Sequence, residues 1–232
     1  MRIKAVLFDL GWTLVNIMES PEIYKRILEA SGVRISAEEA LKAHQANERE
    51  SNIFEGMIEL GEDFWVKWNQ KFLERLGIQE NRELLAQRII ELWWEYAGLE
   101  LYPDVVETLT QLKARGVKVG VVTNGLKSDF QQILSKVGLS DHFEVVVGID
   151  TCKKAKPNRE IFLYAINKLR VRPGEAIFVG DSVKQDYEGA EKAGLKPLLI
   201  DREGKTPANV ETIRSLTEVL SYIQKPRESC LT

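Results

Sequence analysis

Carboxylate side chains follow two short apolar segments that lie far apart in the chain. Asp9 comes directly after Ile3–Phe8, and Asp181 comes just after Ala176–Val179, with Asp186 five residues later. Magnesium prefers oxygen ligands, so these aspartates could share this ion if the fold brings them together. A carboxylate in such a setting can also act as a nucleophile and form a covalent intermediate.

Groups suited to an anion follow two other apolar segments. Thr123 and Asn124 come directly after Val117–Val122, and Lys156 lies in the segment after Phe143–Val147. A lysine, a threonine hydroxyl and backbone N–H groups can together hold a phosphate. Two further lysines lie beside Lys156, but only Lys156 directly precedes a proline, which makes it the stronger candidate.

The elements that must position these residues alternate along the second half of the chain. Strands are expected at 3–8, 117–122, 143–147, 176–179 and 197–200, and helices at 105–114, 128–137, 160–169, 185–193 and 210–223. Such alternation predicts an α/β protein whose parallel sheet is covered on both faces. Ligands bind outside the carboxyl ends of the strands of such a sheet, so the polar groups above are expected to converge on one edge.

The segment between about Leu14 and Leu99 is expected to be helical throughout. Ser20-Pro21 has the pattern of an N-cap followed by proline at the first helical position. Ser36 and Glu39 have the spacing of a capping box. Because the first strand is expected to join the later ones in one sheet, this helical stretch is predicted to be an insertion.

The composition excludes several classes of protein. Of the 232 residues, 44% are hydrophobic, and the formal net charge is −3, which disfavours nucleic acid as a partner. Apolar runs are too short for a membrane span or a signal peptide, so a cytoplasmic protein is expected. Cys152 and Cys230 are too few for a zinc site or a disulfide scaffold.

Four segments carry a resemblance to a known family. They are Val6-Leu7-Phe8-Asp9-Leu10-Gly11-Trp12-Thr13-Leu14, Val121-Val122-Thr123-Asn124-Gly125, Lys156-Pro157 followed by Ile161-Phe162, and Val179-Gly180-Asp181-Ser182 through Asp186. In this order they resemble the motifs of the haloacid dehalogenase superfamily of hydrolases with a helical cap of the first class. The resemblance implies a Rossmann-like doubly wound parallel sheet core (1–15 and 99–232) and an inserted all-helical cap domain (16–98).

The resemblance also implies a magnesium-dependent phosphatase acting on a small phosphorylated metabolite, as a monomer or homodimer. Asp9 would form an aspartyl-phosphate, and Lys156 would neutralise Asp9 and the substrate. The groups implied to bind substrate or phosphate are Leu10, Gly11, Thr123, Asn124 and Lys156. The groups implied to hold Mg²⁺ are Asp9, the main-chain carbonyl of Gly11, Asp181 and Asp186, with Asp186 either a ligand or an orienting residue.

Position 11 departs from the family pattern. Phosphatases of this family usually carry a second aspartate two residues after the nucleophile, as general acid and base, and here that residue is Gly11. General acid–base catalysis is typically worth ~10²–10⁴-fold in rate, so ester hydrolysis is expected to be slow. Trp12 is also unusual for its position, and its side chain is expected either to line the pocket or hinge or to serve in packing.

Three alternatives follow from the missing aspartate. A dehalogenase-like enzyme would need no metal, and the intact Asp181 and Asp186 argue against it. A phosphonate-cleaving enzyme would need a cap lysine, for which the candidates by location are Lys25, Lys42, Lys67 and Lys71. A non-enzymatic protein that binds a phosphorylated ligand is the third. The phosphatase is preferred because the other motif residues remain.

Overall fold

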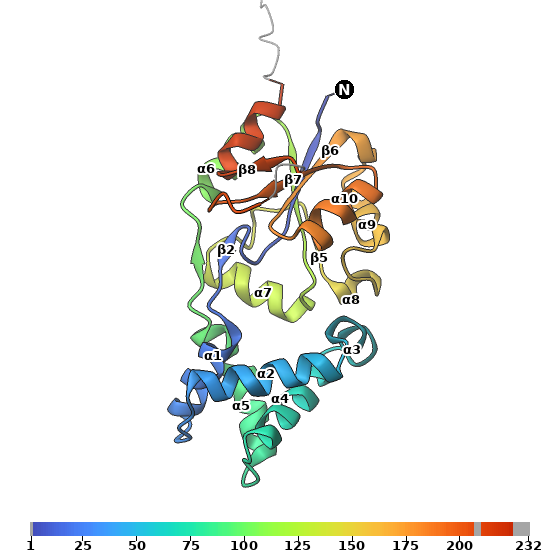
Figure 1. The fold of residues 1–232 in the computed structure, drawn as a ribbon. Coiled ribbons are helices and arrows are strands. Elements are labelled where there is room, and N and C mark those ends of the chain that lie inside the picture. Colours follow the sequence, from blue (N-terminus) through green and yellow to red (C-terminus); the bar gives the residue numbers. More distant parts are fainter. Residues whose placement is uncertain (1, 207–209, 225–232) are drawn as a thin grey trace, which may run out of the picture.

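A six-stranded parallel sheet forms the centre of the protein in the computed structural model, which describes residues 2–206 and 210–224 (Figure 1). The strand order is β5-β4-β1-β6-β7-β8. The strands are β1 (Ala5–Phe8), β4 (Lys118–Val122), β5 (Val145–Val147), β6 (Ala176–Gly180), β7 (Lys196–Ile200) and β8 (Thr212–Ile213). Strand β1 pairs with β4 on one side and with β6 on the other, so the carboxyl ends of these three strands lie next to one another. This is the edge at which such sheets bind ligands.

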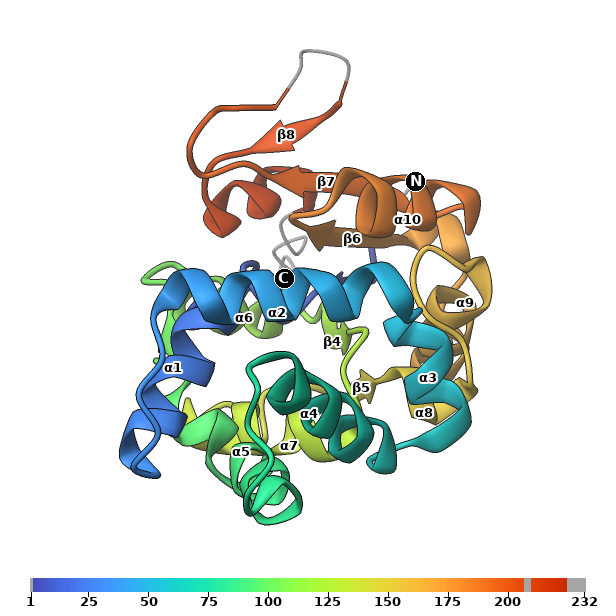
Figure 2. The same ribbon diagram turned by 60° about the horizontal axis from the view of Figure 1, so that its bottom comes forward.

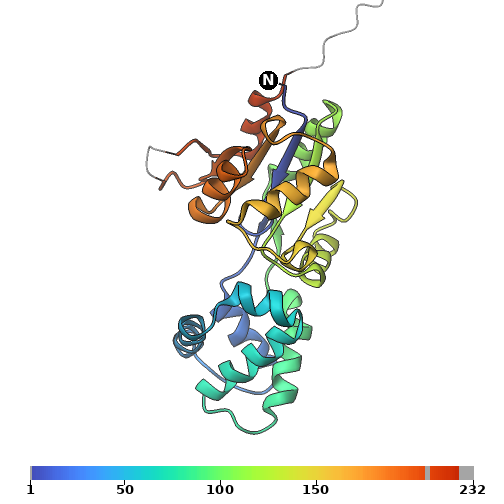
Figure 3. The ribbon, with the colours of Figure 1, turned by 90° about the vertical axis from the view of Figure 1, so that its right-hand side faces the viewer.

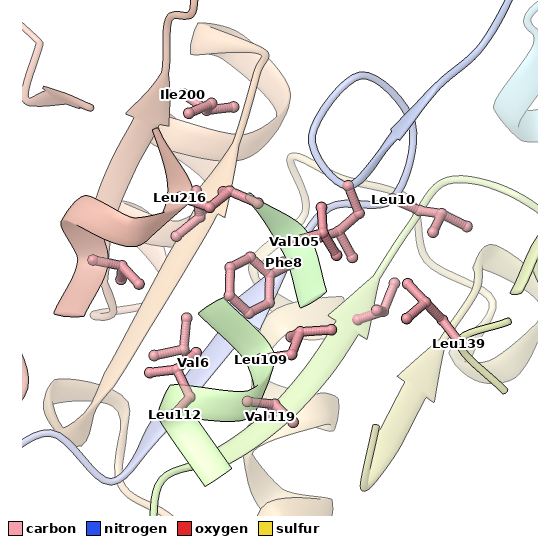
Figure 4. Close-up of a cluster of buried hydrophobic side chains, with 14 of the residues drawn as sticks. Val6, Phe8, Leu10, Val105, Leu109, Leu112, Val119, Leu139, Ile200 and Leu216 are labelled. Atoms are coloured by element: carbon pink, nitrogen blue, oxygen red, sulfur yellow. The ribbon is translucent and has the colours of Figure 1, made fainter. Parts of the chain in front are cut away.

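The side chains of β1 alternate between two cores, as the period of a strand requires. Val6 and Phe8 face one core (Figure 4), and Ala5 and Leu7 face the other. The first core is covered by α6 (Val105–Ala114), α7 (Lys127–Lys136) and the 3-10 helix η3 (Leu216–Tyr222). The second is covered by α9 (Arg159–Leu169) and α10 (Glu188–Lys192). The sheet is therefore buried on both faces, and the predicted α/β fold is confirmed.

Five helices are inserted between β2 (Val15–Asn16) and β3 (Glu100–Leu101) and lie beyond one end of the strands of the sheet (Figure 3). They are α1 (Ser20–Ala30), α2 (Ala37–Glu50), α3 (Ile53–Leu60), α4 (Asp63–Arg75) and α5 (Arg82–Tyr96). They have a core of their own, in which the rings of Tyr24 and Phe72 stack 3.8 Å apart. The chain enters and leaves this insertion through the short antiparallel pair of β2 and β3. The proposed domain boundaries, 15/16 and 98/99, stay a prediction.

The insertion also contacts the helices beside the sheet. In Figure 2, α3 lies beside the short helix α8 (Ile149–Cys152). A small apolar cluster crosses this boundary, with Met57, Phe64 and Trp68 on the insertion and Leu126 and Ile149 on the sheet side. The indole of Trp94 donates a hydrogen bond to Asp129 Oδ1 on α7 at 3.1 Å. These contacts hold the insertion over the carboxyl edge of the sheet.

A local signal accounts for the start of α2, whereas α1 has Glu19 and not the predicted Ser20 as its N-cap, without a side-chain cap. The predicted capping box of α2 is present, since Ser36 Oγ accepts a hydrogen bond from Glu39 N at 3.2 Å and the Glu39 carboxylate accepts one from Ser36 N at 2.8 Å. A 3-10 turn, η1 (Pro173–Glu175), leads into β6.

No helix among the described residues is long and apolar enough to span a bilayer. Cys152 is a free thiol, and Cys230 lies outside the described residues.

Two predicted helices were wrong in detail. The segment 210–223 was expected to be one helix, but it contains β8 and then η3. Its β-branched residues Thr212 and Ile213 favour a strand, and Leu199 N donates to Glu211 O at 2.9 Å to extend the sheet. The expected helix 185–193 is instead a π-helical turn, η2 (Val183–Tyr187), followed by α10. Such turns occur mostly within helices at functional sites, and this one carries Asp186.

Candidate active site

Three aspartates converge at the carboxyl end of the central strands. Asp9 follows β1, Asp181 follows β6, and Asp186 lies in η2. One carboxylate oxygen from each lies within 4.8 Å of the other two. A set of three hard oxygen donors at this spacing fits a divalent cation such as Mg²⁺, so the cluster could bind a metal.

The position of Asp186 depends on a glycine at the end of β6. A Cβ atom on Gly180 would lie 2.4 Å from Asp186 Cγ, which no side chain permits. The Asp186 carboxylate is fixed further by a hydrogen bond from Ser182 N to Oδ2 at 2.9 Å. Each of its oxygens retains a lone pair beyond the hydrogen bond it accepts. Asp186 can therefore ligate a metal or orient Lys156, and both roles predicted for it remain open.

Lys156 places a buried cation among these carboxylates. Its side chain is 3% exposed, and Nζ lies 2.6 Å from Asp186 Oδ1 and also contacts Asp9 Oδ1. The Lys156–Pro157 peptide bond is cis. Asn124 holds the Lys156 backbone on both sides, because Oδ1 accepts from Lys156 N at 2.7 Å and Nδ2 donates to Lys156 O at 3.2 Å. The side chain of Asn124 thus has a structural task, and its role in phosphate binding stays a prediction.

The electrostatics of the cluster reflect its burial. Burial raises the pKa of Asp9, and Asp186 and Asp181 add to the rise although Lys156 opposes it. Asp181 is exposed as a residue, but the pKa of its carboxyl group is raised because neighbouring groups desolvate it, with Asp186 contributing. Burial alone would lower the pKa of Lys156, but Asp9 and Asp186 outweigh this and raise it. The carboxylates carry more negative charge than one lysine offsets, which favours a bound cation.

All the site residues predicted from the sequence line one pocket of about 440 Å³. They are Asp9, Leu10, Gly11, Thr123, Asn124, Lys156, Asp181 and Asp186. Thr13 lies just behind them, and its hydroxyl donates to Asp181 Oδ1 at 3.4 Å. None of the four candidate cap lysines lines this pocket. Lys25, Lys42 and Lys71 pair instead with glutamates of the insertion.

Several lining residues escaped sequence reasoning. Ile17, Phe54 and Gln185 line the pocket. Phe54 lies in α3, a short helix that the pattern did not distinguish because Gly56 interrupts it. The N-cap Asn52, whose side chain accepts from Glu55 N, was the available signal. Trp12 also lines the pocket and is 47% exposed, which supports the pocket role over the packing role.

A second network, also missed, ties the loop after β1 to the end of the chain. Arg202 donates to both oxygens of Asp104, at 2.8 and 3.1 Å, and to Thr13 O at 3.1 Å. Asp104 also accepts from Leu216 N at 2.8 Å and Ser215 Oγ at 2.9 Å. This network fixes the main chain of Thr13, whose side chain contacts Asp181. It therefore positions one side of the acidic cluster from outside the pocket.

The sequence and the fold are similar to those of known proteins. A family model described as haloacid dehalogenase-like hydrolase matches residues 3–194. A glyceraldehyde 3-phosphate phosphatase of Methanopyrus kandleri is 31% identical, over 97% of this chain and 95% of its own length. A phosphoglycolate phosphatase of Yersinia pestis is 32% identical, over 83% of this chain and 78% of its own. The crystal structure of a HAD phosphatase from Thermococcus onnurineus has a TM-score of 0.65 and 31% identity, covering 94% of this chain and 97% of that one.

Proposed function

Since the chain belongs to the haloacid dehalogenase-like hydrolases, we propose that it is a magnesium-dependent phosphatase that cleaves a small phosphorylated metabolite through an aspartyl-phosphate at Asp9. The observation that carries this proposal is the convergence of Asp9, Asp181, Asp186 and Lys156 in one pocket. Relatives named as phosphatases of small phosphorylated metabolites support the substrate class.

The residues assigned to the metal are Asp9, Asp181 and Asp186, with the main-chain carbonyl of Gly11. When bound, Mg²⁺ would stabilise negative charge on the phosphoryl oxygens in the transition state. We assign the same electrostatic task to Lys156 and hydrogen bonding of the phosphoryl group to Thr123, with Leu10 and Gly11 contributing main-chain groups.

We assign the nucleophilic attack to Asp9. One of its oxygens would form a bond to phosphorus while the bond from phosphorus to the ester oxygen breaks, leaving an aspartyl-phosphate and an alcohol. Water would then attack phosphorus, releasing inorganic phosphate and restoring Asp9. Lys156 holds Asp9 in place through both steps by its contact with Oδ1.

Two protons must move without a carboxylate at position 11. The leaving oxygen takes a proton, and the attacking water loses one. With Gly11 at the usual place of the acid and base, we assign these transfers to solvent or to the substrate itself. Slow ester hydrolysis and faster cleavage of acyl or aryl phosphates, which have better leaving groups, are the expected consequence.

The inserted helices are assigned the role of a cap, residues 16–98, that closes the pocket from solvent. Ile17 and Phe54 are the residues by which this cap reaches the pocket. The cap thereby supplies part of the surface that meets the non-phosphate portion of the substrate.

The test is an assay with p-nitrophenyl phosphate and acetyl phosphate in the presence of Mg²⁺. Wild type should turn over both, and Asp9→Asn should turn over neither, with Asp141→Asn, an exposed site outside the pocket, as the matched control. Turnover that survives Asp9→Asn rejects the nucleophile. Absence of turnover together with thermal stabilisation by phosphate would point to a binding protein, and halide release from 2-haloacids in EDTA would point to a dehalogenase.

A further inference from the structure

We propose that this pocket selects phosphate esters whose leaving group is uncharged, and that Trp12, Ile17 and Phe54 form the apolar wall that receives it. This inference rests on the proposed phosphatase function and adds the substrate class. It matters because two relatives of similar identity are named for substrates of different charge, an aldehyde in one and a carboxylate in the other. Overall sequence identity does not distinguish between these two substrates, so the inference is drawn from the residues that line the pocket.

The pocket has a polar side and an apolar side that come from different parts of the chain. The charged groups, Asp9, Lys156, Asp181 and Asp186, all come from the ends of sheet strands or the segments just after them. The apolar wall comes from the loop after β1, from the passage into the insertion and from the first turn of α3. A phosphoryl group held by the polar side leaves the remainder of the substrate to this wall.

The conformation of Trp12 leaves its ring accessible for contact with a substrate. Its indole N–H donates to Ile17 O at 3.2 Å, which links two members of the wall. Its backbone has φ of 53°, a left-handed conformation that is uncommon for a bulky residue and often marks functional sites. A large aromatic side chain that is 47% exposed beside a pocket is suited to contact with an apolar or neutral ligand.

Phe54 is fixed by packing across the boundary between the insertion and the sheet. It packs against the apolar cluster that contains Met57, Phe64 and Trp68 of the insertion and Leu126 and Ile149 of the sheet side. The wall is therefore already formed when the insertion lies over the sheet. A preformed apolar surface receives a neutral group without the cost of desolvating a charge.

Charge complementarity argues against a second anionic group on the substrate. Among the described residues that line the pocket, Lys156 is the only lysine or arginine, and its ammonium group already contacts Asp9 and Asp186. Lys153, on the neighbouring segment, donates instead to Ile58 O at 3.3 Å. Three carboxylates, one ammonium and one divalent ion leave a formal charge of zero before the phosphate dianion binds. A carboxylate on the leaving group would then have no cation to pair with.

The matched substrate pair is glyceraldehyde 3-phosphate and 3-phosphoglycerate, which differ in an aldehyde against a carboxylate. We expect kcat/KM of the wild type with Mg²⁺ to be at least ten-fold higher for the aldehyde, with glycerol 3-phosphate as a second neutral ester and phosphoglycolate as a second anionic one. Equal values for the two classes, or a preference for the anionic esters, would overturn the inference.

A gain of function tests the wall itself. Phe54→Arg places a cation opposite the phosphate site and should shift the ratio of kcat/KM toward 3-phosphoglycerate by at least ten-fold, whereas Phe54→Leu, which keeps the wall apolar, should leave the ratio in favour of the aldehyde. Trp12→Lys is the second variant, because its exposed position tolerates a charge. An unchanged ratio in both cationic variants, with folding verified by circular dichroism, counts against the wall.

The two proposals fail in different ways. If none of the four esters is hydrolysed, and neither p-nitrophenyl phosphate nor acetyl phosphate is, the phosphatase function itself is rejected. If the esters are hydrolysed but their charge makes no difference, the phosphatase function stands and only the apolar wall is rejected.

Discussion

The ammonium group of Lys156 lies 2.6 Å from Asp186 Oδ1 and also contacts Asp9, so one buried lysine joins acids 147 residues before it and 30 residues after it. Buried charges are tolerated only when they are paired and hydrogen-bonded. The end of β1, the segment before α9 and the turn η2 are therefore held together by a single side chain. Removing this cation has consequences for folding as well as for catalysis.

Lys156→Met keeps the length of the side chain but leaves two buried carboxylates without their cation. Breaking a buried pair in this way typically costs about 3–5 kcal/mol, so the free energy of unfolding in EDTA should fall by that order. Urea denaturation measures it. Added Mg²⁺ should recover part of the loss, since it offsets the same charges. Lys154→Met is the control, because Lys154 forms only an exposed pair with Glu160 at 3.5 Å. Equal midpoints for the two variants would contradict the prediction.

Gly11→Asp should accelerate ester hydrolysis. A Cβ atom at position 11 would meet only Ile17 Cδ1, at 3.3 Å, so a side chain fits after a small shift. The added carboxyl can serve as general acid and base, for which the ceiling is ~10²–10⁴-fold, and we expect a gain of several-fold or more. The gain should be larger with glycerol 3-phosphate than with p-nitrophenyl phosphate, whose leaving group needs less assistance. Gly11→Asn, which adds a side chain of similar size without a carboxyl group, should give no such gain. If the Gly11→Asp variant folds but hydrolyses esters no faster than wild type, another group already transfers the proton.

Mg²⁺ should raise the melting temperature of the wild type, because a ligand that binds only the folded state stabilises it, by about 2.7 kcal/mol at 100 times its Kd. Asp181→Asn should remove most of this shift. Asp181 is exposed at the pocket, so the variant should fold normally. Differential scanning calorimetry with and without Mg²⁺ measures the effect, and Asp141→Asn should respond as wild type does. A full Mg²⁺ shift in Asp181→Asn would exclude this residue as a metal ligand.

The pair between Arg202 and Asp104 should make stability depend on acid pH. Burial would raise the pKa of Asp104, but hydrogen bonds from Arg202, Leu216 N and Ser215 lower it overall. A carboxyl with a lowered pKa stabilises the fold above its unfolded pKa of about 3.9, and the contribution is lost as pH falls through the folded value. Wild type should therefore exceed Asp104→Asn by about 1.5–3 kcal/mol near pH 7, and the gap should shrink below about pH 4. A gap that stays constant from pH 7 to pH 2.5 would contradict this.

Local patterns predicted most of the sheet and its helices. The apolar runs that became β1, β4 and β6 are short, bounded by polar residues and buried on both faces, so their assignment needed no tertiary information. The acidic residues followed these runs directly, which is why their convergence could be predicted from the topology of a parallel sheet.

Features made by long-range contacts could not be predicted in this way. Arg202 and Asp104 are 98 residues apart, and neither has a neighbour that signals the pair. Likewise, Phe54 enters the pocket because α3 packs against α8, not because of its own spacing. In 210–223, apolar residues three apart are compatible with a helix and also with the observed strand and 3-10 helix. The pairing of β8 with β7, which the local pattern does not reveal, determines which of the two forms.

The pair β2–β3 is the place where the chain passes from the sheet domain into the helices and back, with Val15 opposite Leu101 and Asn16 opposite Glu100. The acidic cluster and Lys156 lie on one side of this junction and Phe54 on the other. A helical unit transplanted from a relative between these two short strands would change what the enzyme recognises while leaving the bond-breaking machinery as it is. Such a unit would carry Ile17 and Phe54 with it, whereas Trp12, in the loop after β1, would stay, so recognition is divided between the insertion and the sheet domain.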